Sequence, residues 1–340
     1  MLISLSRAQE IVASFARQHV LVVGDLMLDR YIVGTVDRIS PEAPVPVVRV
    51  GQERNMAGGA ANVAMNIRSL GGQVSAAGVV GRDLAGRELM GVMHRAGIGT
   101  QGVAVLDGVR TTLKTRIIAE HQQVVRVDWE DPLRLTPPAL RRFCAGVASA
   151  MRGVTAAAID DYDKGVIGQE VVEAVLNRAR QQRIPVGFDP KRNHGLDVRG
   201  ISLATPNAKE AFEAAGLESH AVGPRPEDDP QLRRAADILL RRWAPQQLII
   251  TLGGHGMYLA SRKRPPRVIP TKAREVYDVS GAGDTVIAAC VLAVAAGADY
   301  YEAAVIGNYA AGVVVGKLGT ATCSTDELLA AIQDDERLGA

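Results

Sequence analysis

Short apolar runs alternate along the chain with longer segments that mix apolar and polar positions. Apolar runs between turn residues predict buried strands, and apolar residues three or four positions apart predict amphipathic helices. Strands followed by helices favour an α/β fold whose parallel sheet is covered on both faces. The expected strands are 20–24, 74–80, 155–159, 185–188, 201–205 and 248–251 with a hairpin at 257–269, and the expected helices are 60–70, 84–96, 166–181, 208–215, 231–242 and segments from 283, 301 and 325.

Two segments interrupt this alternation, because they have strand-like flanks and no helices beside them. Residues 30–50 contain three prolines between β-rich flanks, and residues 110–129 are typical of a β-hairpin. A small sheet without covering helices needs burial of its edges and open face by a substrate or a second subunit. We expect these segments to form a lid over a core of residues 1–29, 51–109 and 130–340.

Composition and charge exclude several functional classes. The formal net charge of +2 over 340 residues is too small to indicate a nucleic-acid or membrane-surface partner. The three cysteines are widely spaced and odd in number, which favours reduced thiols in the cytoplasm over a disulfide framework. The charged N-terminal segment lacks the apolar core of a signal peptide, and the apolar run 286–296 is too short to cross a bilayer.

The most informative segment is residues 278–284, which read Asp-Val-Ser-Gly-Ala-Gly-Asp before a helix of small residues. The start of a helix has free N–H groups and a positive partial charge, and glycines let an anion approach the backbone closely. The backbone of Gly281, Ala282 and Gly283 therefore suits an anion, and Asp284 places a carboxylate beside it. Phosphoryl transfer to a hydroxyl requires both of these features, charge stabilisation and proton removal.

Polar groups near the N-terminus suit a sugar. Gly58 and Gly59 precede a helix that carries Asn62, and Asp29 follows the first predicted strand. Ligands of open α/β sheets bind outside the carboxyl ends of the parallel strands, where these groups would meet sugar hydroxyls. A simple turn with Asn62 in solvent, and a cap or turn role for Asp29, remain alternatives.

Three later clusters suit phosphate groups. Asn207 and Glu210 offer oxygen atoms to a hydrated Mg²⁺, or form a capping box at the start of a helix. Lys191 follows a strand and can reach a phosphate, or is an ordinary surface lysine. The glycine-rich segment 251–256 also follows a strand; it offers N–H groups to an anion, or makes a hairpin turn.

The first strand of the predicted lid hairpin carries two cations on one face. Strand periodicity places Thr112, Lys114 and Arg116 on the same side. An anionic substrate beneath the lid would suit them, whereas a solvated strand face is the alternative. Two nucleotide fingerprints are missing: no G-x-G-x-x-G follows the first strand, and the glycines at 312–316 lack the spacing and the Ser/Thr of a P-loop.

Together these motifs resemble the ribokinase-like (PfkB) carbohydrate kinases over nearly the whole chain. The motif at 58–62 is weak alone, but its combination with the motif at 278–284 is specific. Ser280 stands where the family usually has Thr, and it keeps the hydroxyl. The resemblance implies a ribokinase-like three-layer sandwich with a β lid, and a kinase that uses ATP, Mg²⁺ and, in many members, a monovalent cation such as K⁺.

The resemblance also implies roles for particular residues. Asp284 is the base for the sugar hydroxyl, and the backbone of Gly281 to Gly283 stabilises the transferred phosphoryl group. Asn207 and Glu210 organise Mg²⁺ and its waters, and Asp278 and Ser280 lie at the position of the monovalent cation. The sugar is held by Asp29, Gly58, Gly59 and Asn62, and the ATP site is lined by Lys191, Asn207, Thr251, Gly253, Gly254, Gly256 and Asn308.

Segments 24–31, 38–46, 161–165, 189–191 and 316–322 are similar to one branch of the family, the heptose 7-phosphate kinases of bacterial ADP-heptose synthesis. This likeness implies phosphorylation of the anomeric O1 of D-glycero-β-D-manno-heptose 7-phosphate, for the lipopolysaccharide core. Because an anion far from ATP needs its own cations, we expect Lys114 and Arg116, with Arg38, to bind the existing phosphate. We also expect a single-function kinase, since the chain ends at residue 340, and a homodimer through the lid.

Other functions remain as alternatives. A kinase for fructose 1-phosphate or tagatose 6-phosphate would use the same machinery. A non-catalytic sugar-binding regulator of the same fold is disfavoured by the intact Asp284 and its glycines. A dinucleotide-dependent oxidoreductase is disfavoured by the missing glycine fingerprint.

Overall fold

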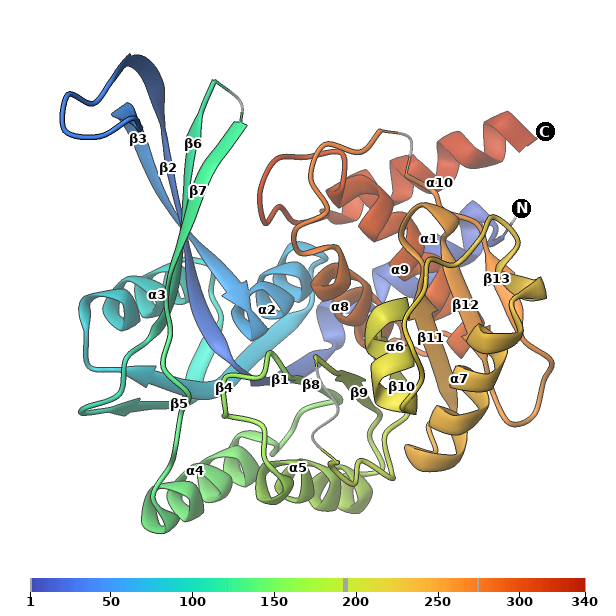
Figure 1. Ribbon diagram of the computed structural model, residues 1–340. Coiled ribbons are helices and arrows are strands. Elements are labelled where there is room, and N and C mark those ends of the chain that lie inside the picture. The colour runs from blue at the N-terminus through green and yellow to red at the C-terminus, as the bar shows by residue number, and fades with distance from the viewer. Residues whose placement is uncertain (1, 121, 192–194, 274, 340) are drawn as a thin grey trace.

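The central sheet contains nine strands within the described residues, in the order β13-β12-β11-β10-β9-β8-β1-β4-β5 (Figure 1). The structure is a computed structural model that describes residues 2–120, 122–191, 195–273 and 275–339. β12 pairs antiparallel with β11 and with β13, and the other neighbours pair parallel. The strands are β1 (His19–Gly24), β4 (Gln73–Gly81), β5 (Gly99–Leu106), β8 (Ala156–Asp160), β9 (Val186–Asp189), β10 (Leu203–Ala204), β11 (Gln247–Thr251), β12 (Met257–Ala260) and β13 (Arg267–Ile269).

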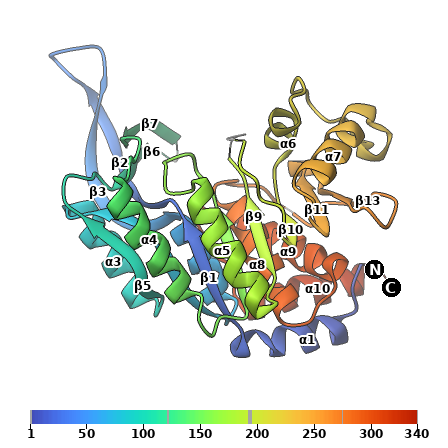
Figure 2. The same cartoon turned by 90° about the horizontal axis from the view of Figure 1, so that it is seen from below.

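Helices cover both faces of this sheet, as Figures 1 and 2 show. The central strand β1 illustrates why, because Val20 and Val22 point into one apolar core while Leu21 and Val23 point into the other. One face is covered by α4 (Pro137–Ala150), α5 (Gln169–Gln182), α6 (Ala208–Ala215) and α7 (Pro230–Arg242), and the other by α1 (Leu5–Ala13), α2 (Ala60–Ser69), α3 (Leu84–Arg95), α8 (Ala282–Ala295), α9 (Tyr300–Val314) and α10 (Thr325–Gly339).

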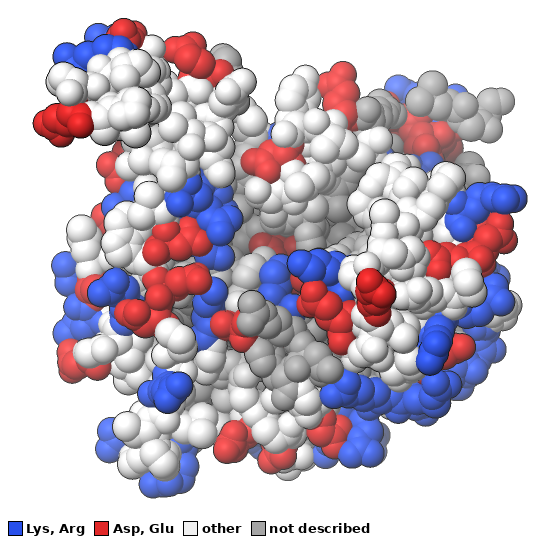
Figure 3. Space-filling view, in the orientation of Figure 1, with Lys and Arg blue, Asp and Glu red and all other residues white. Residues whose placement is uncertain are grey.

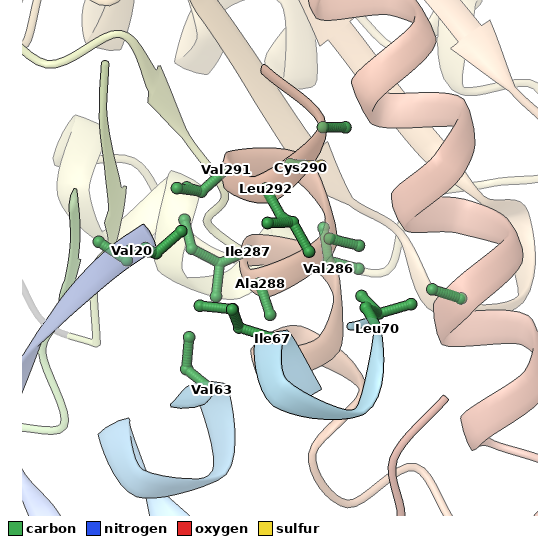
Figure 4. Close-up of a cluster of buried hydrophobic side chains, with 14 of the residues drawn as sticks. Val20, Val63, Ile67, Leu70, Val286, Ile287, Ala288, Cys290, Val291 and Leu292 are labelled. Carbon is green, nitrogen blue, oxygen red and sulfur yellow. The ribbon is translucent and has the colours of Figure 1, made fainter. Parts of the chain in front are cut away.

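Helix α8 is buried along nearly its whole length, between α2, α9 and the sheet (Figure 4). Ile287 and Val291 belong to the same buried cluster as Val20 of β1, and Ile67 of α2 completes the contact. A helix that is apolar on all sides is stable only in such a setting. This packing fixes the N-terminus of α8, and therefore Asp284, at the edge of the core.

A second sheet of four strands projects from the core in Figures 1 and 2. Its order is β3-β2-β6-β7, with antiparallel pairs at both edges and a parallel pair in the middle. β7 is exposed along its whole length. We call this four-stranded sheet the lid; its strands are β2 (Leu26–Ile39), β3 (Pro46–Gly59), β6 (Thr112–Ala119) and β7 (Gln122–Trp129).

The expected α/β architecture with a mostly parallel sheet and a smaller second sheet is confirmed. Three elements were not expected, namely α1, β5 and α4. β5 is an edge strand that contains two glycines, and α4 begins with two prolines and buries only Phe143 and Val147 of its residues. The boundaries between core and lid remain a prediction. None of the described helices has the length and apolar character of a membrane span.

Candidate active site

Asp284 lies in the first turn of α8 and is only 3% exposed. Both of its carboxylate oxygens accept a hydrogen bond: Oδ1 from the Tyr162 hydroxyl at 2.6 Å, and Oδ2 from Asn62 Nδ2 at 2.7 Å. Burial raises the pKa of Asp284 to about 6, against the opposing effect of these two hydrogen bonds and of Lys191. The carboxyl is thus a buried group of fixed orientation that titrates just below neutral pH.

Asn62 connects α2 to this carboxylate. It is 1% exposed, so the alternative that it faces solvent is wrong. Asn66 Nδ2 donates to the Asn62 carbonyl at 3.0 Å, and Thr285 Oγ1 donates to Asn66 Oδ1 at 3.0 Å. Gly281 has a φ of 79°, and a Cβ on it would lie 2.6 Å from Asn62 Nδ2, so only glycine fits there.

Tyr162 is a site residue for which sequence reasoning gave no role. It lies just after β8, and the loop that carries it wraps around the buried carboxylate of Asp25. Asp25 accepts the backbone N–H groups of Tyr162, Lys164 and Val166 at 2.8, 3.2 and 3.0 Å. This wrapping also explains why α5 begins at Gln169 and not at Val166 as expected. A polar residue directly after β1 was the signal that could have indicated such an anchored loop.

An acidic corner lies beside Asp284, at the ends of β8 and β9. Asp160 and Asp189 are register partners there, and Asp189 accepts a hydrogen bond from Thr205 Oγ1. Neither carboxylate oxygen of Asp160 has a hydrogen-bond partner among the described residues. Burial, with the charges of Asp284 and Asp189, raises the pKa of Asp160 well above its ordinary value. Such an unsatisfied buried group calls for a proton, a water molecule or a cation.

Asn207 and Glu210 form the capping box that was one of their two interpretations. Asn207 Oδ1 accepts the Glu210 N–H at 2.9 Å, and Glu210 Oε2 accepts the Asn207 N–H at 2.8 Å. The other carboxylate oxygen of Glu210 lies 3.3 Å from Lys191 Nζ. The ammonium of Lys191 in turn lies 4.8 Å from the centroid of the Tyr162 ring. The structure therefore brings Lys191, Glu210 and Tyr162 together at the acidic corner.

Five of the seven residues expected to bind ATP line one cavity of about 190 Å³, whereas Lys191 and Asn207 are not part of its lining. Backbone from β11 and its following turn forms one wall, α9 forms another, and the first residues of α8 close one end. Much of the remaining lining is apolar, as a purine base requires. Asn308 Nδ2 donates to the Pro270 carbonyl at 2.7 Å. The expected residues in the lining are Thr251, Gly253, Gly254, Gly256, Asn308, Ala282 and Gly283, and they are joined by Met257, Thr271, Val276, Val279, Val286 and Val315.

Asp278 ties the glycine-rich turn to a second loop. Its Oδ1 accepts the Ser280 N–H at 2.9 Å, and its Oδ2 accepts the Gly319 N–H at 3.0 Å. The turn at 278–284 is thereby held against residues 316–320.

On the lid side, Arg116 pairs with Asp29. Arg116 Nη1 lies 2.7 Å from Asp29 Oδ1, and the guanidinium carbon lies 5.3 Å from the Tyr31 ring centroid. A Cβ on Gly58 would lie 2.7 Å from Asp29 Oδ2, so glycine gives this carboxylate its space. Lys114 Nζ lies 6.0 Å from the Tyr162 ring centroid, and burial lowers the pKa of Lys114. The alternative of a solvated strand face for these two cations is wrong.

The structure does not bring Arg38 to the other candidates. Arg38 is exposed on the outer part of β2, nine residues beyond Asp29 on one strand. At about 3.3 Å per residue this is roughly 30 Å along the lid. No pattern in residues 30–50 indicated that one strand would run so far past the site. Figure 3 shows the hollow between lid and core, with both basic and acidic side chains on its walls.

The fold is shared with sugar kinases of known structure. Phosphofructokinase-2 from Escherichia coli in complex with potassium matches with a TM-score of 0.72 at 20% identity, over 94% of this chain and 99% of that one. Arabidopsis thaliana ribokinase complexed with ribose and ATP matches with a TM-score of 0.68 at 18% identity, over 93% of this chain and 99% of that one. At such identities the likeness shows the fold alone.

Sequence relatives give the family. The bifunctional protein HldE of Pelobacter propionicus is 42% identical over 312 residues, which are 92% of this chain and 62% of that protein. HldE of Pseudomonas syringae pv. syringae is 44% identical over 322 residues, which are 95% of this chain and 65% of that protein. The chain thus spans less than two thirds of the length of these relatives. Residues 17–327 match the model of the pfkB family carbohydrate kinases, and the chain belongs to this family of sugar-phosphorylating transferases.

Proposed function

We propose that this chain transfers the γ-phosphoryl group of ATP to the anomeric O1 of D-glycero-β-D-manno-heptose 7-phosphate and so forms the 1,7-bisphosphate. One observation carries the proposal: the buried Asp284 directly follows Ala282 and Gly283 of the cavity lining, and it accepts a hydrogen bond from Tyr162, whose ring lies 6.0 Å from the lid cation Lys114. A donor in the cavity and an acceptor beneath the lid would then meet at this carboxylate. The relatives named HldE, which carry a heptose-phosphate kinase part, support the choice of sugar.

Asp284 removes the proton of the anomeric hydroxyl as O1 attacks the γ-phosphorus. A base with a pKa of about 6 is largely ionised at neutral pH and is more basic than an ordinary carboxylate. Ala282 and Gly283 belong to the first turn of α8, where N–H groups have no partner within the helix. They stabilise the charge that develops on the transferred group. The lid excludes water, which would otherwise compete as acceptor.

The lid supplies the cations for the phosphate that the sugar already carries. Lys114 has no carboxylate within ion-pair distance in the part of the chain that the structure describes, so its charge is available to a ligand. Arg116 is paired with Asp29 through Nη1 and keeps further N–H donors for a phosphate oxygen. Asp29 keeps its second oxygen for a sugar hydroxyl. Arg38 belongs to the outer lid, where it could serve only a second subunit.

Magnesium fits the acidic corner as a partly hydrated ion. No three His, Cys, Asp or Glu side chains of the described residues come together as a metal cage. Mg²⁺ is usually held by one or two carboxylates together with water and substrate phosphates, so a cage is unnecessary. The unpartnered oxygens of Asp160 and the carboxylate of Glu210, with Asn207, would hold it. When bound, the ion neutralises charge on the phosphates. Asp278 and Ser280 remain our candidates for a K⁺ site.

We further propose a homodimer through the lid, in the cytoplasm. Val125, Val127 and Trp129 of β7 are between 37% and 45% exposed, and strand periodicity puts them on one face. An open apolar sheet face of this kind suits a second copy of the chain. Sedimentation velocity tests it: the wild type should sediment as a dimer, and Val125→Asp with Val127→Asp as a monomer. A wild-type monomer at micromolar concentration would contradict the proposal.

A coupled ADP-release screen across sugar phosphates tests the substrate. It should include heptose 7-phosphate, fructose 1-phosphate and tagatose 6-phosphate, with Asp284→Asn as the blank. We expect the highest kcat/KM with heptose 7-phosphate. Activity on a hexose phosphate with none on heptose 7-phosphate would support the kinase activity and contradict the proposed substrate. Silence with every sugar, together with measurable sugar binding, would favour the non-catalytic regulator.

A further inference from the structure

The phenol of Tyr162 is in direct contact with the proposed base. Its hydroxyl donates to Asp284 Oδ1 at 2.6 Å, on the opposite carboxylate oxygen from Asn62. The two donors come from different elements, the loop after β8 and helix α2. Two fixed donors on two oxygens determine the plane of a carboxylate as well as its position, whereas one donor would leave it free to rotate. The base is therefore held from both sides before any substrate arrives.

The loop that carries the phenol is itself held in place by hydrogen bonds to a buried carboxylate. Asp25, directly after β1, accepts the Tyr162 N–H and two further N–H groups of the same loop. Asp25 is 1% exposed, and its three hydrogen bonds anchor the loop to the centre of the sheet. The Tyr162 ring thus stands on a rigid support and not on a mobile loop. Precise hydrogen-bond geometry at the hydroxyl follows from this support.

Two lysines from opposite parts of the site approach the same ring. Lys191, at the acidic corner, has its ammonium 4.8 Å from the ring centroid, and Lys114, on lid strand β6, has its ammonium at 6.0 Å. Both distances are within the range of cation–π attraction. A cation near the ring also makes the phenol a stronger hydrogen-bond donor. Tyr162 therefore donates to the base and lies within cation–π range of both candidate phosphate-binding lysines.

We propose that Tyr162 is a positioning residue for the kinase reaction, whose hydroxyl orients Asp284 toward the sugar hydroxyl and stabilises its ionised form. The inference rests on the proposed function, in which Asp284 is the base. Tyr162 keeps its proton throughout and transfers nothing to substrate. Its role is to ensure that the carboxylate is charged and aligned at neutral pH, although the site around it is buried.

The surroundings of Asp284 explain why such a donor is needed. Asp29 of β2 brings negative charge toward the carboxylate, and the carboxyl groups of Asp160 of β8 and Asp189 of β9 are close enough that burial and neighbouring charges, Asp284 among them, raise their own pKa values well above the ordinary value. Lys191 is the cation that opposes them. Burial and like charges favour the protonated carboxyl, which cannot act as a base. The Tyr162 and Asn62 hydrogen bonds act in the opposite direction, because they favour the ionised form.

Tyr162→Phe tests the proposal, because it removes the hydroxyl and keeps the ring beneath the lysines. Loss of a hydrogen bond to a charged group should raise the pKa of Asp284. The acid limb of kcat/KM for the sugar phosphate should then move to higher pH by ~1–2 units. At pH 6 the variant should be about 5- to 50-fold slower than wild type, and the deficit should shrink above pH 8. If the apparent pKa of the acid limb in Tyr162→Phe stays within 0.3 unit of the wild-type value, the proposal is overturned, however large the loss of activity.

Tyr309→Phe is the matched control. Tyr309 donates to Asp335 Oδ2 at 2.6 Å, so this variant removes a similar hydroxyl from a carboxylate outside the site. It should leave the acid limb unmoved. Thermal unfolding of both variants reports any general loss of stability, which would lower activity equally at every pH.

A readout independent of activity separates this inference from the proposed function. The infrared difference between wild type and Asp284→Asn isolates the Asp284 carboxyl band, and its titration gives the pKa directly. The same difference in the Tyr162→Phe background should titrate ~1–2 units higher. Near-normal turnover of Asp284→Asn would remove Asp284 as the base, and this inference with it, but would leave the kinase activity standing. If Asp284→Asn is inactive but the Asp284 carboxyl band titrates at the same pH in the wild-type and Tyr162→Phe backgrounds, only the role of Tyr162 is removed.

Discussion

Arg116 on lid strand β6 pairs with Asp29 on β2 at 2.7 Å, and neither side chain is more than 14% exposed. The sequence assigned Asp29 to the sugar and Arg116 to its phosphate, but the structure joins them to each other. β2 and β6 are neighbouring strands of the lid, and Asp29 lies in the buried first part of β2. A sugar phosphate that contacts both groups must therefore share this ion pair.

Breaking the pair from one side should destabilise the protein. Arg116→Ala leaves the Asp29 carboxylate buried without its cation, at a cost on the order of 3 kcal/mol. The double variant Arg116→Ala with Asp29→Asn should recover part of this loss, because no charge remains unpaired. Urea unfolding of the two single variants and the double variant measures the coupling. Strictly additive effects would mean that the pair contributes nothing to stability.

Removal of the lid cations should weaken binding of the phosphorylated sugar. Lys114→Ala should raise the KM for the sugar phosphate by about tenfold, since one charge-assisted contact is lost, and should leave the KM for ATP within about twofold. Arg126→Ala is the control, because Arg126 is the register partner of Arg116 on the exposed strand β7 and pairs only with Asp128 among the residues described. Equal changes in both KM values would contradict the role of Lys114.

The sequence predicted the layers of the fold and much of the site, because strand and helix periodicity and the ends of parallel strands are local properties. Asp284 and Asn62 were found in this way, and the structure joins them. The ATP site followed from the family resemblance, and five of its seven expected residues line one cavity. Tyr162 and Asp160 were not assigned roles. The place of Tyr162 depends on how the loop after β8 wraps around Asp25, which joins residues more than 130 positions apart in the chain.

Arg38, in contrast, was predicted to belong to the site but lies far from it. It was expected to join Lys114 and Arg116 at the substrate's phosphate, but β2 extends from Leu26 to Ile39 and carries Arg38 away from the core. Strand length depends on pairing with β3 and β6, which periodicity in one segment does not report. The capping box at Asn207 and Glu210 was correctly read, although it does not decide between a structural role and a role beside Mg²⁺.

Glu210→Gln should raise the Mg²⁺ concentration needed for half-maximal turnover. The amide keeps an oxygen for the Asn207 N–H, so helix α6 should stay capped. The variant loses the charge that faces Lys191 and the proposed ion, which should increase the requirement for Mg²⁺ by about tenfold. Glu213→Gln, a more exposed position on the same helix, is the control. An unchanged Mg²⁺ titration would exclude Glu210 from the ion site.

Asp284→Asn should reduce turnover by about 10² to 10⁴-fold, as expected for loss of a general base. The change preserves size and removes charge, so nucleotide affinity and the cooperative unfolding transition should persist. Isothermal titration with ADP and a thermal melt check both points. Turnover within tenfold of wild type would sink the assignment of Asp284 as base.

The same substitution should also change how stability depends on pH. The folded-state pKa of Asp284 is about 6, above the ordinary value of 3.8 for an unfolded aspartate. Between these values the folded protein binds more protons than the unfolded chain, so this group's contribution to stability is lost as pH rises from about 4 to 6. Relative to Asp284→Asn, the wild type should therefore lose about 3 kcal/mol of unfolding free energy between pH 4 and pH 7, from a shift of about two pKa units. Parallel urea titrations at several pH values measure this difference directly, and the offset between the two proteins at any one pH does not matter. A difference that stays constant with pH would mean that Asp284 titrates alike in both states, and the base would then be an ordinary carboxylate with no special basicity.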